Sequence, residues 1–281
     1  MSKTAMRPAL RYYGGKWRTA PWILSHFPPH KCYVEPFGGA ASVLIQKERS
    51  RIEVYNDLNS DVVSYFRVLR EQPEALSRAI HLTPYAREEY DLATSGEDVA
   101  DPIERARRFL VWSWQSQYFK MRSKSGWRAI NNDLRSQSPA ADWANMNHLN
   151  AVAERFRKVQ IEHGPALEVI ERYDSPETLF YVDPPYVLDT RVDRAAYIHE
   201  MTDSDHAKLA SALHAAKGSV VLSGYRSDLY EVLYNDWWSA STTSRINSPS
   251  GAKLATETIW TNAEAQRRLN SQGLFAIEDT P

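Results

Sequence analysis

The sequence predicts an α/β fold in which one open, mainly parallel sheet is interrupted by a mainly helical insertion and closed by a C-terminal β-hairpin. Three observations predict it. In the N-terminal third, strand-like and helical segments alternate, as in parallel sheets with crossover helices. Residues 84–150 show mainly helical spacing, and the alternation resumes after residue 151. Near the end of the chain, two strand-like segments flank a turn-rich segment, which predicts a hairpin.

The elements follow in order along the chain. The N-terminal elements are expected as a strand at 31–34, a small-residue turn at 35–42, a helix at 43–47, a strand at 52–55 and helical spacing from 61 to 80, closed by Pro84. The C-terminal elements are expected as a helix through Phe156, a strand at 159–161, a helix at 165–171, a strand at 178–182, a helix at 202–216, a strand at 219–223 and hairpin strands at 242–246 and 256–260. Residues 1–83 and 151–281 would then form the sheet domain, with 84–150 as its insert. In such sheets, ligands bind beyond the carboxyl ends of the strands.

The composition is that of an ordinary globular protein. Of 281 residues, 34 are Lys or Arg and 35 are Asp or Glu, so the net charge is −1. No apolar run approaches the roughly 18 residues that a membrane span needs, so we expect no membrane partner. The single cysteine, Cys32, excludes an intramolecular disulfide and an all-cysteine metal site. It is compatible with a reducing cytoplasm, where we expect the protein to act.

The balanced net charge hides a segregation of charge along the chain. Residues 1–34 contain basic side chains and no acid, residues 84–104 are acidic, and residues 105–135 are basic and interleaved with aromatic side chains. Basic and aromatic residues together suit phosphate contacts with base stacking. The same pattern also fits a solvated helix face over a tryptophan-containing core. Charge alone leaves both interpretations open.

The small-residue turn at 35–42 and the acid that follows it indicate a ligand site. The turn lies between a strand and a helix, but it lacks the complete Gly-x-Gly-x-x-Gly pattern of dinucleotide sites. Asp57 ends the next strand, where an acid can accept both hydroxyls of a ribose. A tight turn with a helix-capping Asp is the structural alternative. Together the two features point to an adenosine-type ligand.

The strongest signal is the segment Asp183-Pro184-Pro185-Tyr186 at the carboxyl end of a buried strand. Two prolines remove two backbone donors and fix the direction of the carbonyls beside the Asp. Methylation of an exocyclic amine needs such acceptors, because the amine lone pair is delocalised into the ring until both its hydrogens are bound. Tyr186 offers a plane on which a base can stack. A base inside a duplex must be flipped out to reach this site.

In these motifs the chain resembles the Dam-type DNA adenine methyltransferases, including bacterial and phage members. The resemblance is carried by motifs that begin at Tyr12, Val34, Asn56, Thr83 and Asp183, and it extends to residues 197–203 and 221–225. It covers nearly the whole chain in the family's order: the cofactor motif, then the target-recognition insert, then the catalytic motif. It implies a Rossmann-like methyltransferase fold, S-adenosylmethionine as cofactor and DNA as partner, with no metal. The oligomeric state stays open.

The resemblance also implies roles for individual residues. Tyr12 and Lys16 would close over the cofactor, Glu35 to Gly39 would line its methionine side, Asp57 would hold its ribose and Leu58 its adenine. The target adenine would be held by Asp183, Pro184, Pro185 and Tyr186. The full set of expected cofactor contacts is Tyr12, Lys16, Glu35, Pro36, Phe37, Gly39, Asp57, Leu58 and Asp183. The expected DNA contacts are Arg11, Lys120, Arg122, Lys124 and Arg128.

Three departures from the family pattern stand out. Ala41 replaces the second glycine of the usual turn, and Pro165 stands where an acid usually contacts the cofactor. Glu162 or a backbone amide would take over that contact. The loop 119–128 lacks the pattern of the GATC-reading members, so the resemblance does not carry the target sequence.

Other activities fit less well. Cytosine C5 methylation needs a Cys nucleophile, normally after Pro, and Cys32 follows Lys31. Cytosine N4 methylation could use similar acceptors and is the nearest competitor, followed by a catalytically silent DNA-binding protein of the same fold. Protein glutamine methylation would not explain the basic aromatic insert. His199, His206 and His214 form no zinc motif and are expected at the surface or in helix packing.

Overall fold

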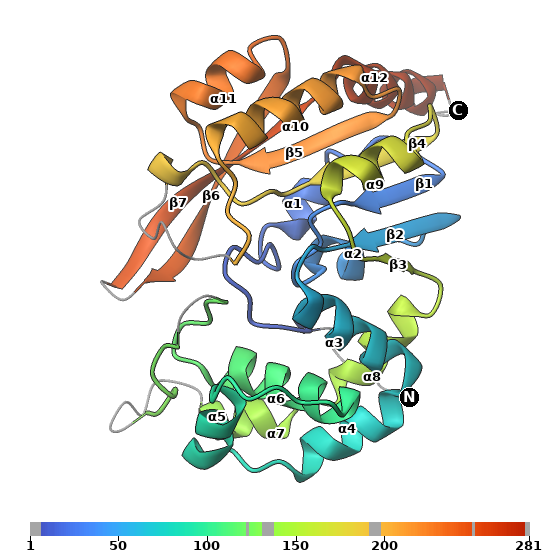
Figure 1. Cartoon of the computed structure of the whole chain (residues 1–281). Coiled ribbons are helices and arrows are strands. Elements are labelled where there is room, and N and C mark those ends of the chain that lie inside the picture. The colour runs from blue at the N-terminus through green and yellow to red at the C-terminus, as the bar shows by residue number, and fades with distance from the viewer. Residues whose placement is uncertain (1–6, 122–123, 131–137, 191–197, 249–250, 279–281) are drawn as a thin grey trace.

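The structure, a computed structural model, describes residues 7–121, 124–130, 138–190, 198–248 and 251–278 (Figure 1). In this part of the chain seven strands form one sheet in the order β3-β2-β1-β4-β5-β7-β6. The strands are β1 (Cys32–Glu35), β2 (Ile52–Asn56), β3 (Gln160–Glu162), β4 (Thr178–Val182), β5 (Ser219–Gly224), β6 (Trp238–Ser248) and β7 (Gly251–Thr261). β1 to β5 pair in parallel, and β7 runs antiparallel to both β5 and β6. The predicted α/β class is confirmed.

The parallel strands are short apolar runs because helices cover both faces of such a sheet. Every residue of β4 and β5 is buried. β4 has the predicted limits, 178–182, and the other parallel strands lie within one residue of theirs. The hairpin strands β6 and β7 are longer than predicted, with 11 residues each.

The winding of the sheet places the site. From β1 the chain moves outward to β2 and β3, and it then returns to add β4 on the other side of β1. Adjacent strands that start connections in opposite directions leave a crevice at their carboxyl ends. Glu35 ends β1, Asp57 follows β2 and Asp183 follows β4. The topology therefore brings three acids to one edge of the sheet.

The helices are α1 (Ala20–Leu24), α2 (Ser42–Gln46), α3 (Ser60–Glu71), α4 (Pro73–Leu82), α5 (Arg87–Ala93), α6 (Pro102–Gln115), α7 (Pro139–Ala144), α8 (His148–Phe156), α9 (Ala166–Tyr173), α10 (Asp203–Ala215), α11 (Asp228–Leu233) and α12 (Ala263–Glu278), with a 3₁₀ turn at Leu188–Thr190. The helical spacing at 61–80 proves to be two helices, because Pro73 begins α4 and Gln72 leaves helical geometry. α10 begins with a capping box between Thr202 and Asp205. None of the described helices is both long and apolar enough to cross a membrane.

The helices between β2 and β3 form a second lobe. Figure 1 shows α5, α6 and α7 away from the sheet, with α3 between them and β2. Phe109 and Trp114 of α6 belong to the same buried cluster as Tyr65 and Phe66 of α3. Because this core runs on into the sheet domain, the boundary of the insert at 84–150 stays a prediction.

Candidate active site

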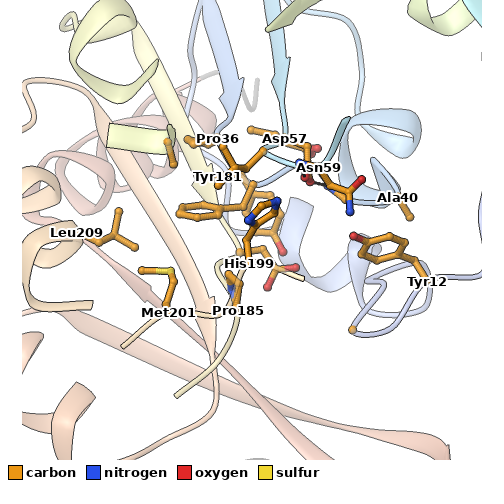
Figure 2. Close-up of a pocket in the computed structure, with 18 of the residues that line it drawn as sticks. Tyr12, Pro36, Ala40, Asp57, Asn59, Tyr181, Pro185, His199, Met201 and Leu209 are labelled. Carbon is orange, nitrogen blue, oxygen red and sulfur yellow. Dashed lines mark hydrogen bonds between the residues drawn. The ribbon is translucent and has the colours of Figure 1, made fainter. Parts of the chain in front are cut away.

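A cavity of about 330 Å³ opens at the carboxyl ends of β1, β2 and β4 (Figure 2). Its size lies within the about 300–1,000 Å³ typical of small-molecule sites. All residues expected to contact the cofactor line this cavity, namely Tyr12, Lys16, Glu35, Pro36, Phe37, Gly39, Asp57, Leu58 and Asp183. Pro185 lines it as well, whereas Pro184 and Tyr186 are buried and do not line it.

The glycine turn is shaped by packing and by backbone geometry. A Cβ on Gly38 would lie 2.1 Å from Cε2 of Tyr55, so this glycine is needed for the packing of Tyr55. Gly39 has φ of +45°, in the left-handed region that favours glycine. Ala41, which replaces the family's second glycine, is also left-handed, with φ of 53°. This backbone conformation explains the usual glycine at that position.

Asp57 fixes this turn from the next strand. Its Oδ2 accepts a hydrogen bond from the Gly39 amide at 2.8 Å, and its Oδ1 accepts one from the Asn59 amide at 2.8 Å. Burial raises the pKa of Asp57, and the two amides oppose that rise. Each carboxylate oxygen keeps a further lone pair for a ligand hydroxyl. Asp57 therefore holds the turn and also faces the cavity.

Glu35 is a buried acid at the end of β1. Its Oε1 accepts hydrogen bonds from the Tyr33 hydroxyl at 2.6 Å and from the Leu44 amide at 2.7 Å. Burial raises its pKa to about 8, against the effect of these two donors. A cation bound in the cavity would favour the ionised form of this carboxyl.

Asp183 is paired on one side and bare on the other. Its Oδ2 lies 2.9 Å from Nζ of Lys16, which also donates to the Gly14 carbonyl at 2.8 Å. Its Oδ1 is buried and has no hydrogen-bond partner within the described residues. Burial raises the pKa of Asp183, and the Lys16 ammonium opposes that rise. A buried acceptor without a partner is costly unless a ligand supplies the donor.

Sequence reasoning missed one buried acid of this site. The Tyr186 hydroxyl donates a hydrogen bond to Oε1 of Glu257, which lies on β7 and is 6% exposed. Nζ of Lys16 lies 3.7 Å from the same oxygen and 4.8 Å from the centroid of the Tyr186 ring. The sequence did offer one signal: Glu257 is an acid inside the predicted strand 256–260, two residues before Ile259.

The three histidines lie at the surface or in helix packing, as expected. His199 is exposed and also lines the cavity, where Figure 2 shows it among the wall residues. His206 and His214 do pack against α11, through Tyr230 and the Leu233 carbonyl.

The resemblance implies an acid after β3 that contacts the cofactor, and the side chain of Glu162 does not take its place. Glu162 turns away to accept hydrogen bonds from Tyr173 at 2.7 Å and from Arg172 at 3.1 Å. Gly164, Pro165 and Ala166 line the cavity instead. This leaves a backbone amide at the start of α9 as the alternative for that contact.

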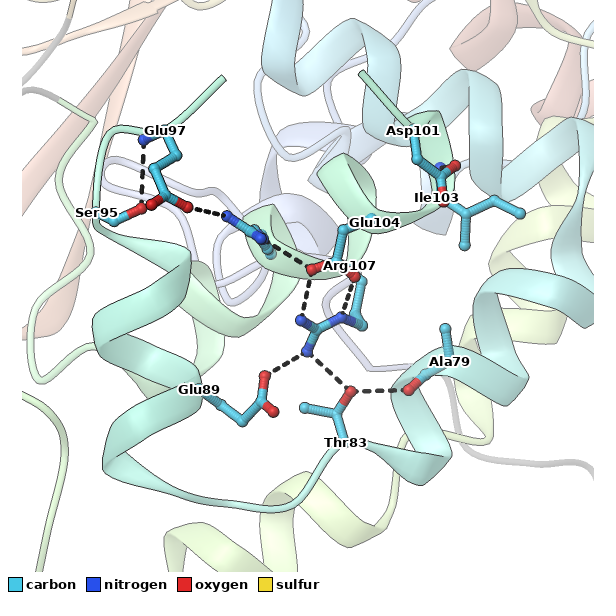
Figure 3. A network of polar contacts seen from close by, with 10 residues as sticks. Ala79, Thr83, Glu89, Ser95, Glu97, Asp101, Ile103, Glu104 and Arg107 are labelled. Atoms are coloured by element: carbon cyan, nitrogen blue, oxygen red, sulfur yellow. Dashed lines mark hydrogen bonds and ion pairs between the residues drawn. The ribbon is translucent and has the colours of Figure 1, made fainter. Parts of the chain in front are cut away.

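The arginines on α6 are paired with acids of the same chain, and Figure 3 shows the pairs around Arg107. The pairs are Arg105 with Asp61, Arg107 with Glu89 and Glu104, and Arg108 with Glu97 and Glu104. Hydrogen bonds from Arg107 lower the pKa of Glu104 to about 2. These pairs fit the alternative interpretation of this part of the basic block, a solvated helix face, and its phosphate interpretation stays a prediction.

Two of the expected DNA contacts, Arg11 and Arg128, meet at one acid together with Arg7. Asp142 of α7 pairs with Arg7 at 3.3 Å, Arg11 at 3.0 Å and Arg128 at 3.5 Å. Three guanidinium groups against one carboxylate leave a surplus of positive charge. Lys124 pairs with Asp91 at 2.9 Å. Lys120 is half-buried, and Arg122 lies outside the described residues.

The fold and the site together define a class of enzyme. A doubly wound sheet with an antiparallel β7 inserted beside β5, and a glycine turn with a following acid at its switch point, is the architecture of S-adenosylmethionine-dependent methyltransferases. The chain belongs to the D12 class N6 adenine-specific DNA methyltransferases, whose sequence signature matches residues 12–248. It is therefore a DNA methyltransferase that acts on adenine N6 with S-adenosylmethionine.

Individual relatives show the same likeness. The Type II methyltransferase M1.LlaDCHI of Lactococcus lactis subsp. cremoris is 25% identical over 285 residues, which cover 93% of this chain and 97% of that protein. The DNA adenine methylase of Salmonella typhi is 33% identical over 109 residues, which cover 37% of this chain and 39% of that protein. Among solved structures, the rRNA methyltransferase aviRa from Streptomyces viridochromogenes matches with a TM-score of 0.37 and 11% identity, over 95% of this chain and 90% of that one.

Proposed function

We propose that this enzyme methylates a flipped-out adenine at a specific DNA sequence, with Asp183 and the Pro184 carbonyl accepting hydrogen bonds from the adenine amine and Tyr186 stacking on the base. The observation that carries this proposal is the bare Oδ1 of Asp183, a buried acceptor at the edge of the cavity. The amine of a target adenine supplies the missing donor.

The chemistry explains why this acceptor matters. S-adenosylmethionine supplies a methyl group on a positively charged sulfur. A new N–C bond forms at N6, the C–S bond breaks with its electron pair going to sulfur, and N6 then loses one proton. The N6 lone pair is conjugated with the ring, so hydrogen bonds accepted from both amine hydrogens make that pair available. Pre-oriented acceptors also stabilise the positive charge that develops on N6.

Lys16 keeps Asp183 in the acceptor form. A protonated carboxyl would present a donor instead of an acceptor. Burial favours protonation of Asp183, while the ammonium at 2.9 Å favours the carboxylate. We infer that Lys16 serves the catalytic acid as well as the cofactor side of the cavity.

The cavity also suits the cofactor. Its acids, the buried Glu35 and the partly buried Asp57 and Asp183, match the positive sulfonium and ammonium groups of S-adenosylmethionine. In this proposal Asp57 holds the ribose, Glu35 faces the methionine ammonium, and Leu58 lies against the adenine. Leu58 is 45% exposed, as expected of an apolar side chain that a ligand covers.

DNA would be read by the insert at 84–150. We propose that Arg11, Lys120, Arg122, Lys124 and Arg128 contact phosphates, with the acids at 91 and 142 setting the positions of their partners. The matched relative from Lactococcus lactis is a Type II methyltransferase by name. On this basis we propose a role in restriction-modification for this enzyme. The bacterial or phage-infected cytoplasm is its expected compartment, since its substrate is DNA.

Substitution of Asp183 tests the catalytic assignment. Asp183→Ala should lower kcat by at least a factor of about 1,000 while cofactor and DNA affinities stay within a factor of about three, because the lost interaction acts mainly in the transition state. Lys16 keeps Glu257 as a partner in this variant. Asp236→Ala, at an exposed position after α11, is the matched control and should leave kcat unchanged. Turnover of Asp183→Ala within tenfold of wild type would contradict the assignment.

A further inference from the structure

A second buried carboxylate lies beside the catalytic acid, and the motifs of the resemblance do not include it. Glu257 comes from the C-terminal hairpin, not from the strands that carry the other acids. β7 pairs with β5 up to the Gly224–Thr258 pair, so Glu257 lies one residue beyond the last paired position. The hairpin thus delivers an acid to the same sheet edge from the antiparallel side.

Glu257 closes a network of four side chains. Its Oε1 accepts the hydrogen bond from the Tyr186 hydroxyl and lies 3.7 Å from Nζ of Lys16. Lys16 in turn lies 2.9 Å from Oδ2 of Asp183 and 4.8 Å from the Tyr186 ring centroid. One ammonium therefore lies between two carboxylates, with the ring of Tyr186 against it.

We propose that Glu257 is a positioning residue for methyl transfer, which fixes the ring of Tyr186 through its hydroxyl and holds Lys16 between the two carboxylates. This inference rests on the proposed function of Asp183 and Tyr186. Glu257 itself does not touch the base. It acts through the stacking surface and through the charge of its neighbours.

Glu257 sets the orientation of Tyr186. A buried tyrosine hydroxyl needs a hydrogen-bond partner, and here that partner is Glu257. The ring otherwise contacts Tyr225 edge-on, with centroids 4.6 Å apart and planes at 68°. The bond to Glu257 fixes the far end of the ring and hence the plane on which the base stacks. Methyl transfer depends steeply on the alignment of the reacting atoms, so a tilted base would react slowly.

Glu257 also affects the charge around Asp183. When both carboxyls are ionised, Asp183 and Glu257 carry two negative charges against one on Lys16. Burial raises the pKa of Glu257, and the charge of Asp183 raises it further. Outside the cluster, Glu35, Tyr181, Tyr225 and Tyr230 also interact with its charges. Because Lys16 is shared, it does not fully neutralise Asp183. The surplus negative charge stabilises the positive charge that develops on N6.

Two substitutions at Glu257 and one at Tyr186 test the proposal. Glu257→Ala should lower kcat at least tenfold while the Kd for S-adenosylmethionine stays within a factor of about three. Glu257→Gln should recover part of kcat, because its amide oxygen still accepts the Tyr186 hydroxyl while its charge is lost. In the Tyr186→Phe background, Glu257→Ala should have a smaller effect than in wild type, since the two residues act through one bond. Glu257→Gln has nearly the native shape and carries the test if the alanine variant does not fold.

Controls separate this role from simple support of the hairpin. Ser241→Ala removes the Ser241–Thr258 hydroxyl contact at 2.9 Å on the same hairpin and should leave kcat unchanged. Wild-type kcat in both Glu257 variants, a loss confined to cofactor affinity, or equal effects in both Tyr186 backgrounds would overturn the proposal. If Asp183→Ala is inactive and the Glu257 variants are normal, only this inference fails. An active Asp183→Ala would instead refute the proposed function.

Discussion

The buried carboxyl of Glu35 makes cofactor binding dependent on pH. Replacement by Gln keeps an oxygen for the Tyr33 hydroxyl and the Leu44 amide, the two donors that Glu35 accepts. The substitution removes only the negative charge that the Glu35 carboxyl carries when it is ionised. Glu35→Gln therefore isolates the contribution of a negative charge at the methionine end of the cavity.

The size of the effect follows from the pKa of about 8 that burial gives Glu35. An acid with that pKa is ionised to about 1% at pH 6 and to about one half at pH 8. The methionine ammonium stays largely protonated below its own pKa of about 8 and binds the ionised carboxylate better. The ionised fraction of Glu35 rises ~50-fold between pH 6 and pH 8, while the protonated fraction of the ammonium falls by about half. Affinity should therefore rise by up to ~25-fold, and binding should release about one proton per cofactor near pH 6.5.

Isothermal titration calorimetry in buffers of different ionisation enthalpy measures both quantities. Wild type should show the rise in affinity and the released proton, and Glu35→Gln should bind at pH 6 and pH 8 with nearly the same Kd. A wild-type affinity that stays flat or falls across this range, or a slope that survives in Glu35→Gln, would refute the reasoning.

Three further outcomes are expected. Asp57→Ala should weaken S-adenosylmethionine binding about tenfold or more, through loss of the ribose contacts and of the bond to the glycine turn; an unchanged Kd in equilibrium dialysis would place the ribose elsewhere. Gly38→Ala should destabilise the fold by about 1–3 kcal/mol, because its Cβ would lie 2.1 Å from Tyr55, and a wild-type denaturation midpoint would show that Tyr55 moves freely. The double change Lys120→Ala and Arg122→Ala should weaken DNA binding and reduce the slope of log K against log salt by about 2; an unaltered slope would remove this loop from the DNA surface.

Much of the fold could be predicted because its signals are local. Short apolar runs ended by Gly, Pro or Asp marked the parallel strands to within one residue. The resemblance predicted that Glu35, Asp57 and Asp183 contact one cofactor, and all three line the cavity at the carboxyl ends of the parallel strands. The break between α3 and α4 was missed, although Pro73 was visible, because the apolar spacing continues across it.

The remaining features depend on contacts between distant segments. Glu257 reaches Tyr186 only through the pairing of the hairpin with β5, which spacing does not specify. Arg105 is neutralised by Asp61, 44 residues away. His199 gave no sign in the sequence of its place in the cavity wall. Charge patterns along a chain do not say which charges the fold pairs with one another.

The most direct test of the central claim is a map of methylated bases in DNA treated with the enzyme and S-adenosylmethionine. Wild type should place N6-methyladenine at one recurrent sequence, and Asp183→Ala should place none, although it still binds DNA and cofactor. Equal N6-methyladenine from both proteins, or methylation on cytosine, would contradict the account.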